Sequence, residues 1–407
     1  MPARHVPYWF DRFPRSRRPS YPRYRGDAET SVVIVGCGLT GAACALSFAS
    51  AGVKTIVLEA DAIGAATTAR SLGIGREDFD ASFRETAAAH GLRAARSLWQ
   101  QMRRASLDFP AALRRLGAKV GLAPADLVMF VRRDPESVRR LQREYQARRD
   151  AGFDHGWIKP AALARDAAVE SGGAIRTHGF SLDPYRVCVA LAAAAASRGS
   201  AIYERSAVRR ICATRKYVDV TTGDSTIRAE AVVIATGAPL ADLRALRRHL
   251  KAQHSYVVVT EPLPAAVRRE VGLRSASMRD ADAPPHFLRW LRDDRLLFSG
   301  GDQREVPARL QEKALVQRTG QLMYELTVLY PAISGLQPEW SWDFPHYETV
   351  DRLPFIGLHR NFPRHLFAIE GARHGAAFAW LAARILLRHY HGEPSKGDDL
   401  FGFSRVL

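Results

Sequence analysis

A stretch of twenty-one residues without a charge, VVIVGCGLTGAACALSFASAG, occupies positions 32–52 and constrains the fold more than any other feature of this chain. It is long enough to cross a bilayer, but it contains Gly36, Gly38 and Gly41 at GxGxxG spacing, between a β-branched run and an alanine-rich one. Each glycine in a helix is unfavourable by about 1 kcal/mol, so a membrane-spanning helix explains the pattern poorly. We instead predict a strand, a tight turn and a helix whose N-terminus receives a pyrophosphate.

The segments that follow indicate which dinucleotide is bound. A second apolar strand, KTIVLEA, contains Glu59, where a carboxylate can bind ribose hydroxyls and favours NAD or FAD over NADP. The small, hydroxyl-bearing loop GAATTARSLGIG comes next, and the strand AEAVVIATGAPL lies far downstream. Near the C-terminus, HLFAIEGARHGAAFAWLAARILLRHYHG is typical of a strand, a glycine turn and a helix from about residue 375. A second helix N-terminus at the cofactor would stabilise the anionic edge of a reduced flavin, which favours FAD over NAD.

The formal net charge of +17 implies attraction to phosphates, anionic lipid or an acidic partner. Solvated helix faces such as RRDPESVRRLQREYQARRD account for much of it without a partner. Residues 1–26 form a basic arm rich in proline and arginine, with Arg17 and Arg18 in tandem but no apolar stretch typical of a signal peptide. The four cysteines lack metal-ligand spacing, so we expect reduced thiols in a cytoplasmic protein, with no metal site and no transmembrane segment.

Together these motifs resemble those of the D-amino-acid-oxidase-like family of FAD-dependent oxidoreductases, which includes glycine, sarcosine and γ-glutamylputrescine oxidases. The resemblance covers about residues 30–391, with VVIVGCGLTG similar to the family's pyrophosphate motif and VDRLPFIG with GARHGAAFAW similar to its flavin-edge signature. It implies an α/β fold, with a Rossmann-like FAD-binding domain of the GR2 type and an antiparallel-sheet substrate domain of the α+β class. We expect a discontinuous FAD-binding domain over 27–84, 172–246 and 345–407, and a substrate domain over 85–171 and 247–344.

The resemblance also implies that FAD is bound non-covalently, because the cysteine that attaches flavin in the sarcosine-oxidase subgroup has no counterpart in this sequence. The residues expected to contact the cofactor are Gly36, Gly38, Leu39, Thr40, Gly41, Glu59, Ala60, Thr67, Thr68, Arg70, Leu72, Gly73, Val208, Thr236, Gly237, Gly357, Gly371, Arg373, His374, Gly375 and Ala376.

Two polar positions of the glycine-type oxidases are altered in this sequence. Phe287 falls where the family has a tyrosine, and His346 where it has an arginine, the two side chains that hold the substrate carboxylate. Arg289 lies two residues beyond Phe287 and therefore on the same face of the predicted strand, which makes it a candidate replacement. His254 is a further candidate, and the glycines around His374 place it at the flavin. The candidate catalytic residues are therefore His374, Arg289, His346, His254 and Phe287.

The resemblance implies oxidation of the C–N bond of an amine or a modified amino acid by hydride transfer to the flavin, followed by hydrolysis of the imine. The electrons would pass to O2 or to a respiratory or other electron-transfer acceptor. Three alternatives stay open: oxidation of a 2-hydroxy acid, a flavin subunit of a hetero-oligomeric dehydrogenase docked through the basic arm, and a flavoenzyme that modifies tRNA. The last ranks lowest, because the sequence shows no RNA-binding module.

Overall fold

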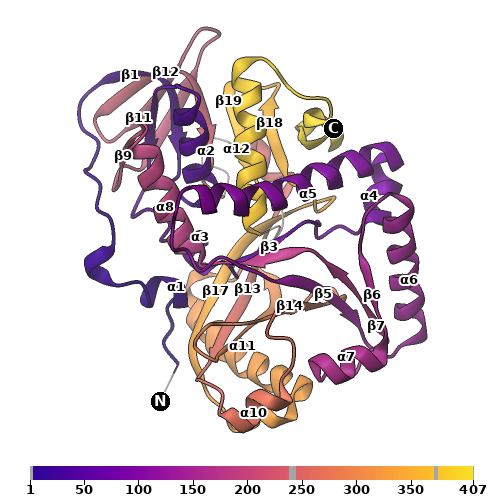
Figure 1. The fold of residues 1–407 in the computed structure, drawn as a ribbon. Helices are drawn as coiled ribbons and strands as arrows, with labels where there is room; N and C mark the ends of the chain where they lie inside the picture. Colours follow the sequence, from indigo (N-terminus) through magenta and orange to yellow (C-terminus); the bar gives the residue numbers. More distant parts are fainter. Residues whose placement is uncertain (1–2, 238–243, 371–374, 407) are drawn as a thin grey trace.

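The computed structural model of the chain describes residues 3–237, 244–370 and 375–406 (Figure 1). Two eight-stranded sheets and one three-stranded sheet organise this part of the chain, and helices pack on both large sheets. The predicted fold class, a mixed α/β architecture with a Rossmann-like unit, is confirmed. Within the described residues, no helix combines the length and the apolar character needed to cross a membrane.

The first large sheet contains the predicted strand that precedes the glycine turn. Its strand order is β10–β11–β12–β1–β2–β9, and β19 pairs with both β12 and β18. The strands β9, β2, β1, β12 and β19 pair in parallel in that order, whereas the pairs β10–β11, β11–β12 and β18–β19 are antiparallel. The strands are β1 (Ala28–Val35), β2 (Thr55–Leu58), β9 (Ala201–Tyr203), β10 (Val208–Ala213), β11 (Val218–Thr222), β12 (Ser225–Ile234), β18 (Phe355–His359) and β19 (Phe362–Ile369).

Burial on both sides explains why residues 32–52 carry no charge. Residues 32–35 at the end of β1 are buried, and three helices, α2 (Leu39–Ser50), α8 (Pro184–Ala196) and α12 (Ala376–His391), pack together beside the sheet (Figure 1). Parallel strands covered in this way read as continuous apolar runs. The run is therefore a core strand followed by a packed helix.

The second large sheet has the order β17–β13–β16–β15–β14–β5–β7–β6. Every pairing is antiparallel except that of β5 with β14, which is parallel. One face packs on α11 (Ala308–Leu329) and α7 (Pro160–Ala167), and the other faces the first unit. Its strands are β5 (Asp126–Val131), β6 (Gly156–Ile158), β7 (Gly173–Thr177), β13 (Leu250–Thr260), β14 (Ala276–Asp280), β15 (Phe287–Trp290), β16 (Leu296–Arg304) and β17 (Pro338–Thr349).

A small sheet of order β3–β8–β4 lies between the two units and connects the cofactor loop to the middle of the chain. Its strands are β3 (Ile74–Arg76), β4 (Ala123–Pro124) and β8 (Gly179–Ser181). The other elements are α1 (Tyr8–Asp11), η1 (Arg15–Arg17), α3 (Thr67–Arg70), α4 (Phe83–His90), α5 (Leu92–Arg115), α6 (Pro135–Asp150), α9 (Arg244–Arg247), α10 (Ala265–Glu270), η3 (Pro331–Ile333), η4 (Asp398–Phe401) and η5 (Phe403–Val406).

Strand pairing differs from the expected division of the chain at two places. β7 lies in the range 172–246 that we expected in the FAD-binding domain, but it pairs with β5 and β6 in the second large sheet. β17 continues to Thr349, four residues beyond the expected crossover at 345. Hydrophobic periodicity identifies these strands but does not say which sheet receives them.

The basic arm packs on the body of the protein at its aromatic residues. Tyr8, Trp9 and Phe13 are buried, and the indole Nε1 of Trp9 donates a hydrogen bond to the carbonyl oxygen of Ser71 at 2.8 Å. Arg4 forms an isolated β-bridge with Trp340 in β17. The arm therefore contacts both large units.

Candidate active site

The turn between β1 and α2 leaves no room for side chains. Gly36 has a φ of +94°, and a Cβ there would lie 2.7 Å from the carbonyl oxygen of Ala235. A Cβ at Gly41 would lie 1.9 Å from the carbonyl oxygen of Gly36. Both positions therefore require glycine, and the first turn of α2 can present free N–H groups to a ligand.

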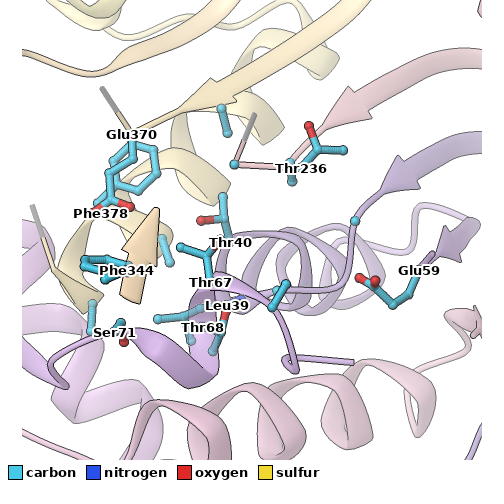
Figure 2. A pocket seen from close by; sticks show the side chains of 18 of the residues that line it. Leu39, Thr40, Glu59, Thr67, Thr68, Ser71, Thr236, Phe344, Glu370 and Phe378 are labelled. Carbon is cyan, nitrogen blue, oxygen red and sulfur yellow. Dashed lines mark hydrogen bonds between the residues drawn. The ribbon is translucent and has the colours of Figure 1, made fainter. Parts of the chain in front are cut away.

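A cavity of about 420 Å³, called the cofactor cavity below, extends from this turn to the start of α12. Figure 2 shows Glu59 at one end of it and Phe344, Phe378 and Glu370 at the other. The cofactor residues predicted from the sequence that line it are Gly36, Gly38, Leu39, Thr40, Glu59, Ala60, Thr67, Thr68, Leu72, Gly73, Val208, Thr236, Gly237, Gly375 and Ala376.

Backbone amides fix the carboxylate of Glu59 just beyond β2. Its Oε2 accepts a hydrogen bond from the N–H of Cys37 at 2.7 Å, and its Oε1 accepts one from the N–H of Asp61 at 3.1 Å. Each carboxylate oxygen keeps a free lone pair. The fixed group can therefore accept hydrogen bonds from the two hydroxyls of a ribose.

The cavity is lined by two helix N-termini, those of α2 and α12. Thr68 Oγ1 accepts a hydrogen bond from the N–H of Leu39 at 2.8 Å, which holds α3 against the first turn of α2. At the start of α12, a Cβ on Gly375 would lie 2.4 Å from the carbonyl oxygen of Ile74. The partial positive charge at both N-termini suits an anionic group such as a pyrophosphate.

Three described residues that were assigned to the cofactor from the sequence, Gly41, Arg70 and Gly357, lie outside this lining. Arg70 forms an ion pair with Asp343 and also donates to the carbonyl oxygen of that residue at 3.2 Å. Gly357 faces His389, whose Nε2 would lie 3.1 Å from a Cβ at that position. The predictions for Gly371, Arg373 and His374 lie outside the described residues.

Arg76 also lines the cavity, although the sequence pattern did not identify it. It is 1% exposed, and it donates to Asp78 at 2.5 Å and to Asp80 at 2.6 Å. Burial lowers its pKa, but the two carboxylates outweigh burial and raise that pKa above its ordinary value. The charged sequence REDFD directly after the glycine loop is the signal that could have found it. The other unpredicted side chains at this end are Ser71, Phe344, Glu370 and Phe378.

The face of the second large sheet next to this end is partly polar. Phe287 lines the cofactor cavity, and Arg279 lies opposite it in the pairing of β14 with β15, on the same face of the sheet. The guanidinium carbons of Arg279 and Arg76 lie 5.9 and 6.0 Å from the centroid of the Phe287 ring. The wall of the cavity thus has an aromatic ring with a buried cation beside it.

Arg279 is buried, and part of its hydrogen-bonding capacity is unused among the described residues. Its Nε and Nη1 have no acceptor among the described residues, and Asp80, the carboxylate paired with it, is 3.6 Å from Nη1. Burial and then the neighbouring Arg76 lower its pKa to about 10, so it remains charged at neutral pH. The buried hydroxyls of Ser277 and Ser299, on the same face, also lack partners. A buried polar group without a partner is costly, which points to a ligand that supplies acceptors.

The two candidate histidines among the described residues lie in different surroundings. His346 lines a cavity of about 660 Å³ that Arg279 also lines. His254 is buried, with its Nδ1 3.3 Å from Asp343, the carboxylate that pairs with Arg70, and it lines neither this cavity nor the cofactor cavity. His254 therefore lies against the Arg70–Asp343 ion pair, and its contact with a substrate stays a prediction.

The side chain of Arg289, a candidate substrate contact, forms its hydrogen bonds with the wall of the cavity. Its Nη1 donates to the carbonyl oxygens of Leu72 and Gly73, 2.9 and 2.5 Å away. A third hydrogen bond reaches the carbonyl oxygen of Leu182 at 3.1 Å. Arg289 does share a face with Phe287, but one more step along the strand carries it behind the cavity wall, where it supports Leu72 and Gly73 from the far side.

The sequence is similar to those of known oxidoreductases. The family model described as FAD-dependent oxidoreductase matches residues 31–388. The "Probable oxidoreductase OrdL" of Haemophilus influenzae is 25% identical over 404 residues, which cover 96% of this chain and 88% of that protein. The γ-glutamylputrescine oxidoreductase of Escherichia coli is 25% identical over 373 residues, which cover 90% of this chain and 85% of the relative.

The fold is similar to that of a solved flavoenzyme. The crystal structure of glycine oxidase from Geobacillus kaustophilus superposes with a TM-score of 0.76 and 21% sequence identity, over 93% of this chain and 99% of that one. At this identity the similarity shows the shared fold and leaves the substrate to be argued from the site.

Proposed function

Because the chain belongs to the family of FAD-dependent oxidoreductases, we propose that it oxidises the carbon–nitrogen bond of an amino acid or amine that also carries an acidic group. When bound, FAD supplies the acceptor for a hydride from the substrate carbon. Water then hydrolyses the resulting imine to a carbonyl compound and ammonia or a smaller amine. The residues of the chain bind the cofactor, orient the substrate and exclude water from the site.

The lining of the cofactor cavity fits FAD. Glu59 suits the ribose, the N-terminus of α2 suits the pyrophosphate and that of α12 suits the anionic edge of the flavin. A Cβ on Gly38 would lie 3.0 Å from Thr68 Oγ1 and narrow the site. None of the described residues that line the cavity is a cysteine. We therefore propose that FAD is held without a covalent bond. Acid precipitation should release the flavin into the supernatant, whereas flavin retained in the precipitate would contradict this.

Arg279 is the observation that carries the substrate part of the proposal. It is a buried, charged guanidinium with two N–H-bearing nitrogens lacking acceptors, beside the aromatic wall of the cofactor cavity. A guanidinium is well suited to bind a carboxylate through two parallel hydrogen bonds. In glycine-type oxidases a tyrosine and an arginine hold the substrate carboxylate, and this chain has Phe287 and His346 at those positions. Arg279 would supply the positive charge in place of that arginine.

The aromatic residues at the ring end have a separate task. Phe287 and Phe344 are 2% and 5% exposed and present apolar surface to the cavity. An apolar surrounding disfavours the ammonium form of an amine, and a substrate must lose that proton before its carbon can release a hydride. With the acidic group held at Arg279, the C–H bond is directed toward the ring end.

The acceptor of the electrons is O2 or an electron-transfer partner. Arg15 and Arg17 of the arm are exposed and would provide the docking surface in the second case. The buried free thiols Cys37, Cys44 and Cys188 support a cytoplasmic location, where thiols stay reduced.

A matched substrate series tests the proposal. The FAD-loaded protein is titrated without oxygen, and bleaching of the flavin is followed with amino acids, their carboxamides, their decarboxylated amines and the corresponding 2-hydroxy acids. We expect the amino acids to bleach the flavin at concentrations about tenfold or more below those of the carboxamides and amines. Bleaching by 2-hydroxy acids alone would replace oxidation of a C–N bond with oxidation of an alcohol. Readmission of air then separates an oxidase, which recovers its colour at once, from a dehydrogenase.

A further inference from the structure

A basic cavity of about 990 Å³, called the arm cavity below, lies on the other side of the wall that Arg289 supports. The N-terminal arm, the end of α5 with the segment after it, the start of α8 and the turn between β15 and β16 surround it. Parts of the chain that are far apart in sequence therefore line the arm cavity together.

The lining of the arm cavity is unbalanced in charge. It contains three acidic side chains against seven basic ones, which are Arg12, Arg114, Lys119, Arg186, Arg274, Arg289 and Arg292. The acids already have partners: Asp183 binds Arg186, Asp293 accepts from Tyr8 and Arg295, and Asp294 pairs with Arg268 and Arg274.

Arg289 is at the base of this cavity and has no carboxylate within ion-pair distance among the described residues. It is 6% exposed, its Nη1 contacts only carbonyl oxygens, and its Nε has no acceptor. Burial lowers its pKa to about 10, which still leaves it charged at neutral pH. The nearby Asp183 favours the charged form of Arg289 but already binds Arg186, so an anion placed in the cavity would relieve the cost of burying this cation.

We propose that the arm cavity binds a small multivalent anion, with Arg289 as the buried anchor and the exposed Arg114, Lys119 and Arg292 at the rim. The ligand should carry more than one negative charge, because basic residues outnumber acidic ones in the lining and come from several parts of the chain. The planar guanidinium group matches the oxygen spacing of both phosphate and carboxylate groups. The property that the two kinds of ligand share is therefore a cluster of anionic oxygens. Trp9 and Trp290 add aromatic surface beside it.

The same contacts connect this site to the cofactor cavity. Leu72 and Gly73, whose carbonyl oxygens Arg289 holds, line the cofactor cavity with their other atoms. An anion that attracts the guanidinium competes with these carbonyl oxygens for its N–H groups. Binding in the arm cavity should therefore change the surroundings of the flavin ring through the Leu72–Gly73 backbone.

Calorimetric titration of the full chain saturated with FAD tests the proposal, because the cofactor cavity is then filled and no turnover is needed. Pyrophosphate and citrate are titrated separately against sodium chloride at matched ionic strength. We expect saturable binding of one of them, weakened about tenfold or more in a protein carrying Arg114→Gln and Lys119→Gln. Preference for pyrophosphate identifies a phosphate ligand, and preference for citrate identifies a carboxylate ligand.

Arg360→Gln is the matched control, since Arg360 is exposed, lies in the turn between β18 and β19, and lines none of these cavities. It should leave the affinity unchanged. Absence of saturable binding by both anions, or an equal loss of affinity in Arg360→Gln, would overturn the proposal. Arg289→Lys tests the connection: the flavin spectrum of the original protein should shift with the anion, and that shift should disappear in the variant.

Discussion

The two ends of the cofactor cavity are built by different means. At the nucleotide end, the main chain forms most of the site. It provides the glycine turn, the N-terminus of α2 and the two backbone amides that fix the carboxylate of Glu59. At the ring end, side chains from both large units meet, with Phe344 from β17, Phe287 from β15 and Phe378 from α12. The first end is a local structure, and the second exists only where distant segments come together.

The two ends therefore differ in how easily substitutions can change what they bind. A site made of backbone changes only when the fold changes, so it suits the part of a cofactor that is always the same. A site made of side chains on strands can be altered one residue at a time. We therefore expect substitutions at the nucleotide end to remove the cofactor, and substitutions at the ring end to change the substrate while the cofactor stays bound.

Gly41→Ala should have the largest effect. Its Cβ would lie 1.9 Å from the carbonyl oxygen of Gly36, so the turn and the helix must move apart. We expect loss of bound flavin and a fall in unfolding free energy of about 1–3 kcal/mol, measured by flavin absorbance and urea denaturation. Gly320→Ala in α11 is the control, because a Cβ there meets nothing within 4 Å. If Gly41→Ala kept its flavin, the nucleotide end would not depend on backbone fit as argued.

Glu59→Gln should weaken FAD binding about tenfold to a hundredfold, because hydrogen bonds from hydroxyls to a charged acceptor are stronger than those to a neutral amide. The dissociation constant is measured by fluorescence titration of the apoprotein with FAD. Asp61→Asn changes the charge of an exposed neighbour that also lines the cavity, and should weaken binding much less. Equal losses in the two variants would mean that charge alone, rather than the fixed position of Glu59, matters.

Arg279→Gln should leave FAD content unchanged and raise KM for an acidic substrate about tenfold to a hundredfold. Its effect on the decarboxylated analogue should be small, since that substrate brings no acidic group to Arg279. Steady-state kinetics with the two substrates provides the comparison. A parallel loss on both substrates would show that Arg279 supports the wall of the cavity and does not bind the acidic group.

His286→Gln should have the smallest effect and should spare both ends of the cavity. Its Nδ1 lies 2.7 Å from Asp280 and its Nε2 3.2 Å from Glu325, and although burial lowers its pKa, these carboxylates outweigh burial and raise it. The stabilisation is therefore full below the ordinary histidine pKa of about 6.5 and is lost as the pH rises through the raised folded value. We expect the melting temperature of the original protein to fall relative to that of the variant as the pH rises above about 6.5. If melting temperature depended on pH in the same way in both proteins, His286 would not contribute to the pH dependence of stability.

The same contrast explains how much could be predicted from the sequence. Gly36, Gly41 and Glu59 were identifiable because each acts within a few residues of a strand end, and local spacing fixes their geometry. Arg279 and Arg289 were not distinguishable in this way. Alternation along β15 correctly placed Arg289 on the face of Phe287, but the neighbour across the sheet depends on the pairing of β14 with β15, which no local pattern contains.

The path of the chain has a consequence for the order in which the protein can mature during synthesis. The chain passes from the first unit to the second, back through β8 and α8, again to β13, and finally to β18, β19 and α12. β19 pairs with β12 inside the first sheet, and Ala376 and Ala379 close the cofactor cavity. A ribosome-bound chain therefore cannot capture FAD in its final site until α12 has been translated, so cofactor loading follows the synthesis of both large sheets.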